Sequence, residues 1–237
     1  MGYRGKILVM GDVHADFGRL NTFVNHKRPD LILQCGDFGY WPRYTTKRER
    51  KGKTRLLPKM HETRLYWCDG NHEDFEALRE RKNDEVYPNV FYMPRGSTLE
   101  LPDGRRVLFI GGGESHDKAW RVEQERAGGD KIWFAEERIT PDDLARLPDQ
   151  PIDIVVTHVA PREFTVWGGG HDMLQPDPSR LALSAALHKY KDRLSLWFFG
   201  HYHARIVGDY HGVRYFGLNM AGRSDWWIEL PAAAQSA

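Results

Sequence analysis

The sequence predicts an α/β fold, and two features of the chain support this prediction. Short apolar runs recur along the chain, and polar, glycine-containing turns end them. Stretches compatible with helices separate these runs, and this alternation is typical of α/β proteins. The chain has 237 residues and shows no internal repeat or inter-domain linker. We therefore expect one domain over residues 1–237 with a large hydrophobic core.

Six apolar runs are predicted to be buried strands, because they are short and rich in β-branched and aromatic residues. They comprise residues 6–10, 31–35, 65–68, 107–110, 152–156 and 194–199. The stretches that favour helices comprise residues 16–26, 73–82, 142–147 and 179–190. The third helix has a favourable start, since Pro141 precedes two aspartates that lie near the positive end of the helix dipole.

The C-terminal section shows the rhythm of hairpins without helices. Its apolar runs begin near Arg205, Val213 and Trp226, and we expect them to form antiparallel strands that complete the sheets. The final segment, residues 231–237, is rich in alanine and is predicted to be a disordered tail.

Composition limits the classes of protein that remain. The formal net charge is +1, so any attraction for a phosphate-rich partner must come from a local patch or from bound metal. Two cysteines are too few for a disulfide framework. No apolar run approaches the roughly 20 residues needed to cross a bilayer, and the N-terminus lacks the apolar region of a signal peptide. These features predict a cytoplasmic protein without a membrane partner.

Side chains that can bind metals follow five of the predicted strands. They are Asp12, His14, Asp37, Asn71, His158, His201 and His203. One histidine in such a place would more often be a buried, hydrogen-bonded core residue. Five such strand endings are hard to assign to packing, because these polar side chains are costly to bury unpaired. Ligands of α/β proteins bind at the carboxyl ends of strands, so we expect a metal site there.

The motifs around these residues resemble the five signature blocks of the calcineurin-like metallophosphoesterase superfamily. The blocks are Asp12-x-His14, Gly36-Asp37, Gly70-Asn71-His72-Glu73, Thr157-His158 and Gly200-His201-x-His203. The resemblance implies a four-layer αββα sandwich of two mixed β-sheets, with a dinuclear metal site at the C-terminal ends of the strands. It also implies that Asp12, His14 and His203 bind one metal. Asn71, His158 and His201 would bind the other, Asp37 would bridge them, and His72 would be catalytic.

The chemistry of the ligand set agrees with that implication. Oxygen and imidazole ligands without thiolates suit two divalent transition-metal ions, manganese first, with iron, zinc or cobalt as alternatives. Two such ions can share a hydroxide that attacks phosphorus, so we predict hydrolysis of a phosphomonoester or phosphodiester. His72 is placed to protonate the leaving group or to neutralise phosphoryl oxygens; its alternative role is to orient a ligand.

The segment after Asp37 favours a bacterial or phage-type branch of the superfamily. The protein Ser/Thr phosphatases carry Gly-Asp-x-x-Asp-Arg-Gly at this point, whereas residues 36–42 here contain neither that second aspartate nor the arginine. Another group must then contact the phosphate. Arg121, at the end of the donor-rich segment 111–121, is our candidate. The alternative is a glycine loop whose polar residues face solvent. In either case His116 and Asp117 could form a further polar pair, and neither is needed as a metal ligand.

A basic run raises the possibility of a nucleic-acid partner. Residues 43–55 contain seven basic side chains and one acidic side chain. Beside a phosphoesterase site they could follow a nucleic-acid backbone, which makes a nuclease or nucleic-acid phosphatase the alternative function. Charge runs are more often solvated loops. A non-catalytic binding module is the third possibility, against which the intact ligand set argues; the oligomeric state stays open.

Overall fold

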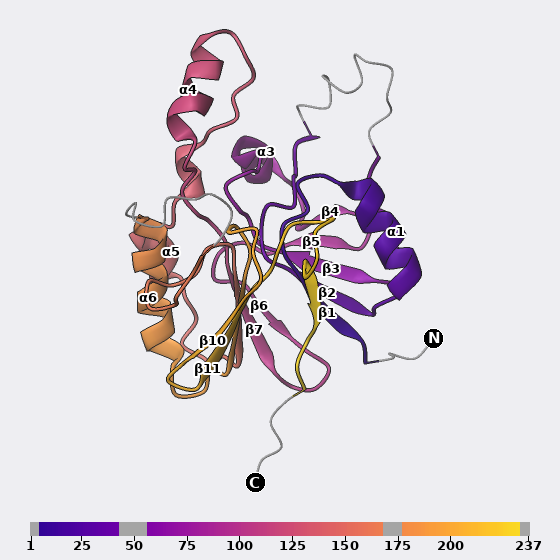
Figure 1. Cartoon of the computed structure of the whole chain (residues 1–237), viewed down its shortest axis with the longest axis vertical. Helices are drawn as coiled ribbons and strands as arrows, with labels where there is room; N and C mark the ends of the chain where they lie inside the picture. The colour runs from indigo at the N-terminus through magenta and orange to yellow at the C-terminus, as the bar shows by residue number, and fades with distance from the viewer. Residues whose placement is uncertain (1–4, 43–55, 168–176, 233–237) are drawn as a thin grey trace.

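The structure, a computed structural model, describes residues 5–42, 56–167 and 177–232. Its strands form two sheets of six strands each (Figure 1). The first sheet has the order β12-β1-β2-β3-β5-β4 and the second the order β10-β11-β9-β8-β7-β6. In each sheet four central strands are parallel and the two edge strands are antiparallel. Both sheets are therefore mixed, as predicted.

The strands of the first sheet are β1 (Ile7–Met10), β2 (Leu31–Gln34), β3 (Arg64–Trp67), β4 (Glu85–Tyr87), β5 (Val90–Tyr92) and β12 (Trp227–Glu229). Those of the second sheet are β6 (Thr98–Glu100), β7 (Arg106–Ile110), β8 (Ile154–Thr157), β9 (Leu196–Phe199), β10 (Ile206–Tyr210) and β11 (Val213–Gly217). The C-terminal strands complete both sheets, since β10 and β11 form a hairpin in the second while β12 pairs with β1 in the first. The prediction for this section is confirmed.

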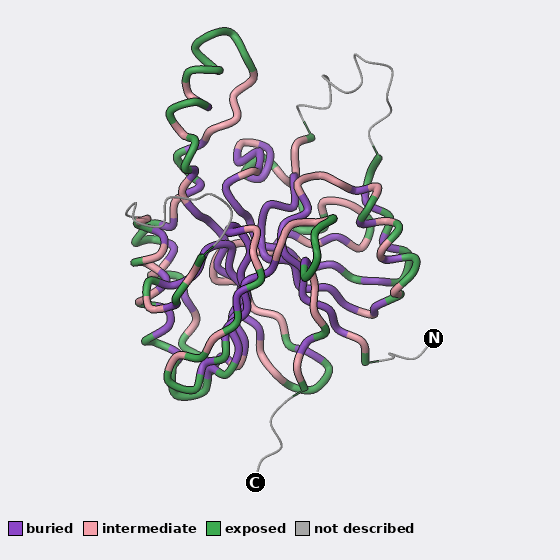
Figure 2. The backbone as a smooth tube through the Cα atoms, in the orientation of Figure 1, coloured by how far each residue is buried: buried purple, intermediate pink, exposed green. Residues whose placement is uncertain are grey.

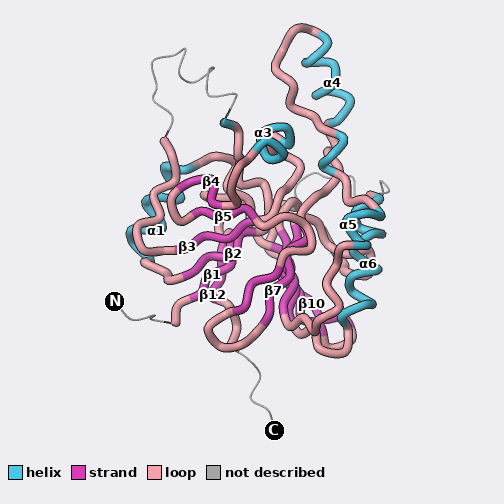
Figure 3. The backbone as a smooth tube through the Cα atoms, turned by 180° about the vertical axis from the view of Figure 1, so that it is seen from behind, coloured by secondary structure: helices cyan, strands magenta, loops and turns pink. Residues whose placement is uncertain are grey.

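Helices cover the outer face of each sheet, which confirms the four-layer sandwich (Figures 1 and 3). Helices α1 (Phe17–Lys27) and α3 (Phe75–Glu80) pack on the first sheet, and α5 (Pro141–Ala145) and α6 (Pro178–Tyr190) pack on the second. A third apolar core lies between the sheets and contains both free cysteines, Cys35 and Cys68. Both thiols are buried among apolar side chains there, as expected for small hydrophobic residues.

Local sequence explains where these helices begin. The side chain of Asp16 accepts a hydrogen bond from the amide of Arg19 at the start of α1. Thr140 and Asp143 form a reciprocal capping box at the start of α5, where Pro141 is the first helical residue. These caps satisfy amides that have no partner within the helix.

One helix was not predicted from the sequence. Helix α4 (Lys118–Arg126) begins inside the donor-rich segment 111–121, which lies outside the predicted helices, and a short 3₁₀ helix, η2 (Ala135–Glu137), follows it. Figure 1 shows α4 projecting beyond the two sheets, and Figure 2 shows that most of its residues are exposed. Arg121 is its one buried residue, so α4 lacks the apolar periodicity that identifies a helix in a sequence.

The C-terminal segment leaves the sandwich after β12. The carbonyl of Pro231 accepts a hydrogen bond of 2.7 Å from the guanidinium of Arg105. Residues 233–237, which make up most of the predicted disordered tail, lie outside the described residues. Among the described residues, no helix has the length and apolar character required to span a bilayer.

Candidate metal centre

The seven predicted ligand residues lie in the turns that follow five parallel strands. Those after β1, β2 and β3 come from the first sheet, and those after β8 and β9 come from the second. Four of them have a left-handed backbone, with φ of 47° at His14, 51° at Asp37, 65° at His201 and 47° at His203. Non-glycine residues rarely adopt this conformation, and where they do the strain often marks a functional site.

Asp12, His14 and His203 form the first group. The Nε2 atom of His203 lies 2.9 Å from Oδ2 of Asp12 and 3.1 Å from Nε2 of His14. Oδ2 of Asp12 is buried, yet no contact in the described part of the chain gives it a hydrogen bond of acceptable geometry. The three ligand atoms lie within 4.8 Å of one another. A cation among them would satisfy this otherwise costly buried oxygen.

Asn71, His158 and His201 form the second group. Oδ1 of Asn71 lies 3.0 Å from Nε2 of His158 and 3.1 Å from Nδ1 of His201, and these two nitrogens are 3.2 Å apart. The Nδ1 atom of His158 lies 2.9 Å from the carbonyl oxygen of Cys35. Because a carbonyl can only accept, Nδ1 carries a proton, and in the neutral ring Nε2 presents its lone pair to the group.

Asp37 lies between the two groups. Its Oδ1 atom is 3.4 Å from Nε2 of His158, and its Oδ2 atom is 3.7 Å from Nε2 of His14. The backbone amide of His72 donates a hydrogen bond of 2.8 Å to Oδ1, which holds the carboxylate in this orientation. Each oxygen of one carboxylate therefore faces a different group of ligands.

The electrostatics of the centre are those of a site built for positive charge. Burial alone would raise the pKa of Asp37, but His158 and other nearby histidines hold it well below its usual range. Burial would lower the pKa of His158, yet the charge of Asp37 and its contact raise it to about 10. The contact with Asp12 likewise raises the pKa of His14 to about 9 against the effect of burial. The buried carboxylates thus favour positive charge on the histidines that surround them.

Two motif glycines allow the strand ends to approach each other. A Cβ atom on Gly70 would lie 2.1 Å from Oδ1 of Asp37, and one on Gly200 would lie 2.0 Å from Oδ1 of Asp12. Both distances are far below a van der Waals contact. Each of these glycines therefore places its own turn directly against a carboxylate of the centre.

His72 overhangs the centre, with Nε2 4.0 Å from Oδ2 of Asp37. Burial, with the nearby charge of Arg121, lowers the pKa of His72 to about 4 against the attraction of Asp37. The Nη2 atom of Arg121 lies 2.7 Å from Nε2 and 3.2 Å from Nδ1 of this ring. An arginine only donates, so His72 is the acceptor and its ring is neutral.

A family comparison agrees with this arrangement. The model of the family described as calcineurin-like phosphoesterase matches residues 5–205. The chain belongs to the calcineurin-like phosphoesterase family. It is a phosphoric ester hydrolase, and its Asp/His cluster is a possible site for the divalent metals of the family. A search of curated proteins found no significant match.

Solved structures of other proteins share the fold of this phosphoesterase. A dimetal phosphatase from Danio rerio is 15% identical, with a TM-score of 0.51 over 91% of this chain and 87% of the other. GAP50, described as the anchor in the inner membrane complex of Plasmodium, is 14% identical, with a TM-score of 0.50 over 95% of this chain and 75% of the other. At these identities the likeness concerns the fold alone.

Arg121 reaches the centre of the phosphoesterase from the projecting helix α4. Its Nε donates to Asp117 at 2.7 Å, and its Nη1 donates to the carbonyls of Asn71 at 3.0 Å and Ile132 at 3.2 Å. Asp117 pairs with Arg121, because residues 117 and 121 lie one helical turn apart. Arg121 is thus held by the protein on three sides beside His72.

Sequence reasoning assigned no role in the centre to three residues that support it. The carboxylate of Glu73 accepts hydrogen bonds from the amides of Gly39 and Tyr40, the latter at 2.7 Å, and so fixes the turn after Asp37. Burial and the charge of Asp37 raise the pKa of Glu73 to about 8.

Ser115 and His116 contact ligands of the second group. Ser115 accepts from Nδ2 of Asn71, and Nε2 of His116 lies 3.2 Å from Nε2 of His201. The motif contained Glu73, but no pattern indicated the contacts of residues 115 and 116.

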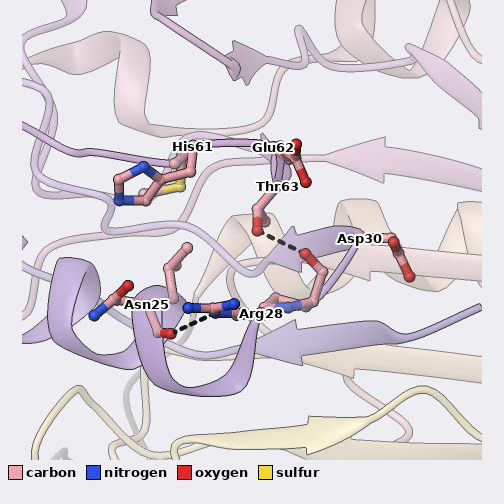
Figure 4. A pocket seen from close by; sticks show the side chains of 9 residues that line it. Asn25, Arg28, Asp30, His61, Glu62 and Thr63 are labelled. Carbon is pink, nitrogen blue, oxygen red and sulfur yellow. Dashed lines mark hydrogen bonds between the residues drawn. The ribbon is translucent and has the colours of Figure 1, made fainter. Parts of the chain in front are cut away.

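A cavity of about 250 Å³ opens onto the centre. Its lining residues are Asp37, Asn71, His72, His116, Asp117, Arg121, His201 and His203. A second pocket, of about 510 Å³, lies between the end of α1 and the turn before β3 (Figure 4). Thr63 and Pro29 line it, and the hydroxyl of Thr63 donates to the carbonyl of Pro29 at 2.6 Å. That pocket adjoins the amino ends of β2 and β3, at the edge of the first sheet opposite the metal centre.

Proposed function

We propose that this phosphoesterase hydrolyses a phosphomonoester or phosphodiester at a dinuclear metal centre. Asp12, His14 and His203 would hold one divalent ion. Asn71, His158 and His201 would hold the other, and Asp37 would contact both. The observation that carries this proposal is that the two oxygens of Asp37 face the two separate groups of ligands.

The residues fit divalent transition metals by their donor chemistry. The lining nitrogens and oxygens include no thiolate, which favours manganese, with iron, zinc or cobalt as alternatives. When bound, the ions would polarise the phosphoryl group and activate a water molecule for attack. Asp12 and Asp37 contribute two negative charges against four positive charges, and Asn71 contributes none. The surplus of positive charge would attract phosphate oxygens into the cavity.

His72 would act on the substrate from the rim of the cavity. Its neutral ring retains one N–H while it accepts from Arg121, and that N–H can donate to a phosphoryl oxygen or to the leaving oxygen. Donors fixed at the place where charge develops lower the barrier, because they need no reorganisation during the reaction.

Arg121 would combine two roles in this proposal. Four of its five N–H groups have partners in Asp117, Asn71, Ile132 and His72. The remaining N–H on Nη2 can donate to one phosphate oxygen. Arg121 would therefore position His72 and add a single phosphate contact, rather than grip the phosphate with its whole guanidinium.

We propose a substrate other than a phosphoprotein, as the bacterial or phage-type sequence pattern implies. The place after Asp37 that holds an arginine in protein Ser/Thr phosphatases is occupied here by the turn containing Tyr40 and Trp41. The indole of Trp41 donates to the carbonyl of His72 at 2.7 Å. Tyr40 and Trp41 thus bring no cation to the cavity, and Trp41 holds the backbone of His72.

A nuclease or nucleic-acid phosphatase is the second candidate, and it rests on the basic run alone. Residues 43–55 lie outside the described residues, so the argument is one of sequence and position after Asp37. This candidate predicts binding of oligonucleotides that weakens steeply as salt rises. A panel of small phosphate esters and oligonucleotides would separate the two enzymatic functions.

Hydrolysis of nitrophenyl mono- and diesters with added Mn²⁺ tests the leading proposal. We expect turnover that a chelator abolishes and Mn²⁺ restores, with two metal ions bound per chain. Purified protein that neither contains nor takes up stoichiometric transition metal would instead support the non-catalytic binding module.

A further inference from the structure

Glu137, at the end of η2, is a fully buried carboxylate that the proposed reaction does not use. Its Oε1 atom accepts from the amide of Ser115 at 2.8 Å and from the indole of Trp133 at 2.9 Å. Its Oε2 atom lies 2.6 Å from Oγ of Ser115. A buried charge is costly unless hydrogen bonds satisfy it, and here two of the three contacts are made to one residue.

These contacts determine the direction of a chain of hydrogen bonds. A serine hydroxyl has one proton, and Ser115 gives it to Oε2 of Glu137. Oγ of Ser115 must then accept from its other neighbour, which is Nδ2 of Asn71 at 3.2 Å. With its NH₂ group held in this way, Asn71 turns its oxygen toward His158 and His201.

The orientation of Asn71 decides whether it can bind a metal. The two ends of an amide group have nearly the same shape, so packing alone does not choose between them. Only the oxygen end has lone pairs for a cation, because the NH₂ end is a donor. A hydrogen-bond partner of fixed direction is therefore required to keep the ligating oxygen in the centre.

We propose that Glu137 is a positioning residue that sets the direction of the Glu137–Ser115–Asn71 chain and thereby presents the Asn71 oxygen to the second metal. This inference rests on the proposed dinuclear function. Ser115 precedes α4 in the chain and Glu137 ends η2, so the clamp formed by these two residues joins the segments on either side of the helix that carries Arg121.

The Glu137→Gln substitution tests the direction of this hydrogen-bond chain, because glutamine has almost the same shape as glutamate. The single amide oxygen of glutamine must accept from the Ser115 and Trp133 N–H groups, which turns its NH₂ group toward Oγ of Ser115. The Ser115 proton is then displaced toward Asn71, whose amide rotates to accept it. The NH₂ group of Asn71 would face the metal position in place of the oxygen.

Calorimetric titration of the metal-free protein with Mn²⁺ measures the effect. We expect one of the two binding events to weaken by about 10- to 100-fold in Glu137→Gln, the range typical of partners that orient metal ligands. Trp133→Phe is the matched control, since it removes one donor to Glu137 and leaves the carboxylate; its two affinities should match those of the wild type. Circular dichroism and thermal melting of each metal-free variant establish that it is folded.

Two further variants keep the test decisive. Ser115→Ala removes the acceptor for Asn71 and should weaken the same binding event, even if Glu137→Gln does not fold. Asn71→Asp has no donor end, so Glu137→Gln should strengthen metal binding in that background, because the displaced Ser115 proton can reach the new carboxylate. The sign of the Glu137→Gln effect should therefore reverse.

Each outcome has a distinct meaning. Wild-type affinities in Glu137→Gln or Ser115→Ala, or equal losses in Glu137→Gln and Trp133→Phe, would overturn the role of Glu137 while the dinuclear proposal stands. A loss in both Asn71 backgrounds would also overturn it. Wild-type protein that binds fewer than two metals would overturn the proposed function and this inference together.

Discussion

Oδ1 of Asp12 accepts a hydrogen bond of 3.0 Å from the backbone amide of His201. Asp12 follows a strand of the first sheet and His201 a strand of the second, so this bond joins the turns of the two sheets inside the centre. The contact depends on Gly200, where a Cβ atom would lie 2.0 Å from the same oxygen. The metal centre therefore depends on the close approach of these two turns.

Gly200→Ala should disrupt the metal centre. Because the new methyl group must displace either Asp12 or the turn, we expect the substitution to abolish binding of at least one metal and to lower the melting temperature. Gly104→Ala is the control: its φ of 83° is unfavourable for alanine, but no heavy atom beyond the adjacent residues lies within 4 Å of the added carbon. The control should cost about 1–2 kcal/mol of stability with metal binding unchanged. Normal metal content in Gly200→Ala would contradict the prediction.

Asp37→Asn and His72→Ala should both lower phosphoesterase activity, but for different reasons. Asp37→Asn removes the charge that faces both ligand groups, so metal content and turnover should fall together. His72→Ala leaves both groups intact and should retain two metals while kcat falls by about 10²–10⁴-fold, the range for loss of a positioned proton donor. Elemental analysis and steady-state kinetics on the same samples separate the two effects. Undiminished turnover in either variant would sink the proposed mechanism.

Arg121→Lys should impair both His72 and the substrate contact. Lysine lacks the planar fork of arginine and cannot donate to Asn71, Ile132 and His72 at once. A buried carbonyl is then left without a donor, which lowers the free energy of unfolding by about 1–3 kcal/mol. We expect lower stability, a higher KM for phosphate esters and a lower kcat. Arg126→Lys, on the same helix but exposed and 3.8 Å from Glu123, should change none of these. Kinetic constants of Arg121→Lys equal to those of the wild type would rule out both roles.

The stability of the metal-free protein should decrease as pH rises from about 6.5 toward 10. The folded-state pKa is raised from 6.5 to about 9 for His14 and to about 10 for His158. The native state therefore binds more protons than the unfolded state across this window, and its extra stability is lost as pH rises through the folded-state values. Metals require neutral imidazole, so Mn²⁺ should raise the melting temperature more at pH 8.5 than at pH 6.5. An equal or smaller rise at pH 8.5 would contradict this prediction.

The sequence was sufficient to predict the layers of the fold and the edge of the sheets at which the site lies. Buried strands such as 31–34 and 154–157 are short continuous apolar runs, and their polar endings stand out because polar groups are costly to bury. The two mixed sheets confirm the prediction of the fold, and the family match confirms the resemblance to the phosphoesterases. The ligand assignments remain predictions, although the structure brings all seven side chains together.

The contacts around the ligands could not be predicted from the sequence. The one buried side chain of helix α4 is an arginine, so the helix has no stripe of apolar residues that a sequence pattern could reveal. Strands β4, β5 and β6 are only three residues long, which is too short for a recognisable pattern. The clamp between Ser115 and Glu137 joins residues 22 positions apart. Neither residue belongs to a periodic pattern, so only the three-dimensional path of the chain reveals their contact.

The left-handed backbone of His14, Asp37, His201 and His203 has a consequence for engineering. Each residue costs of the order of 1–2 kcal/mol in this conformation relative to glycine, and the rest of the fold must supply that free energy. A selection for thermostability alone would therefore favour glycine at the half-buried ligand positions, His14 and His203, at the expense of metal binding. Stability and activity should oppose each other at these turns.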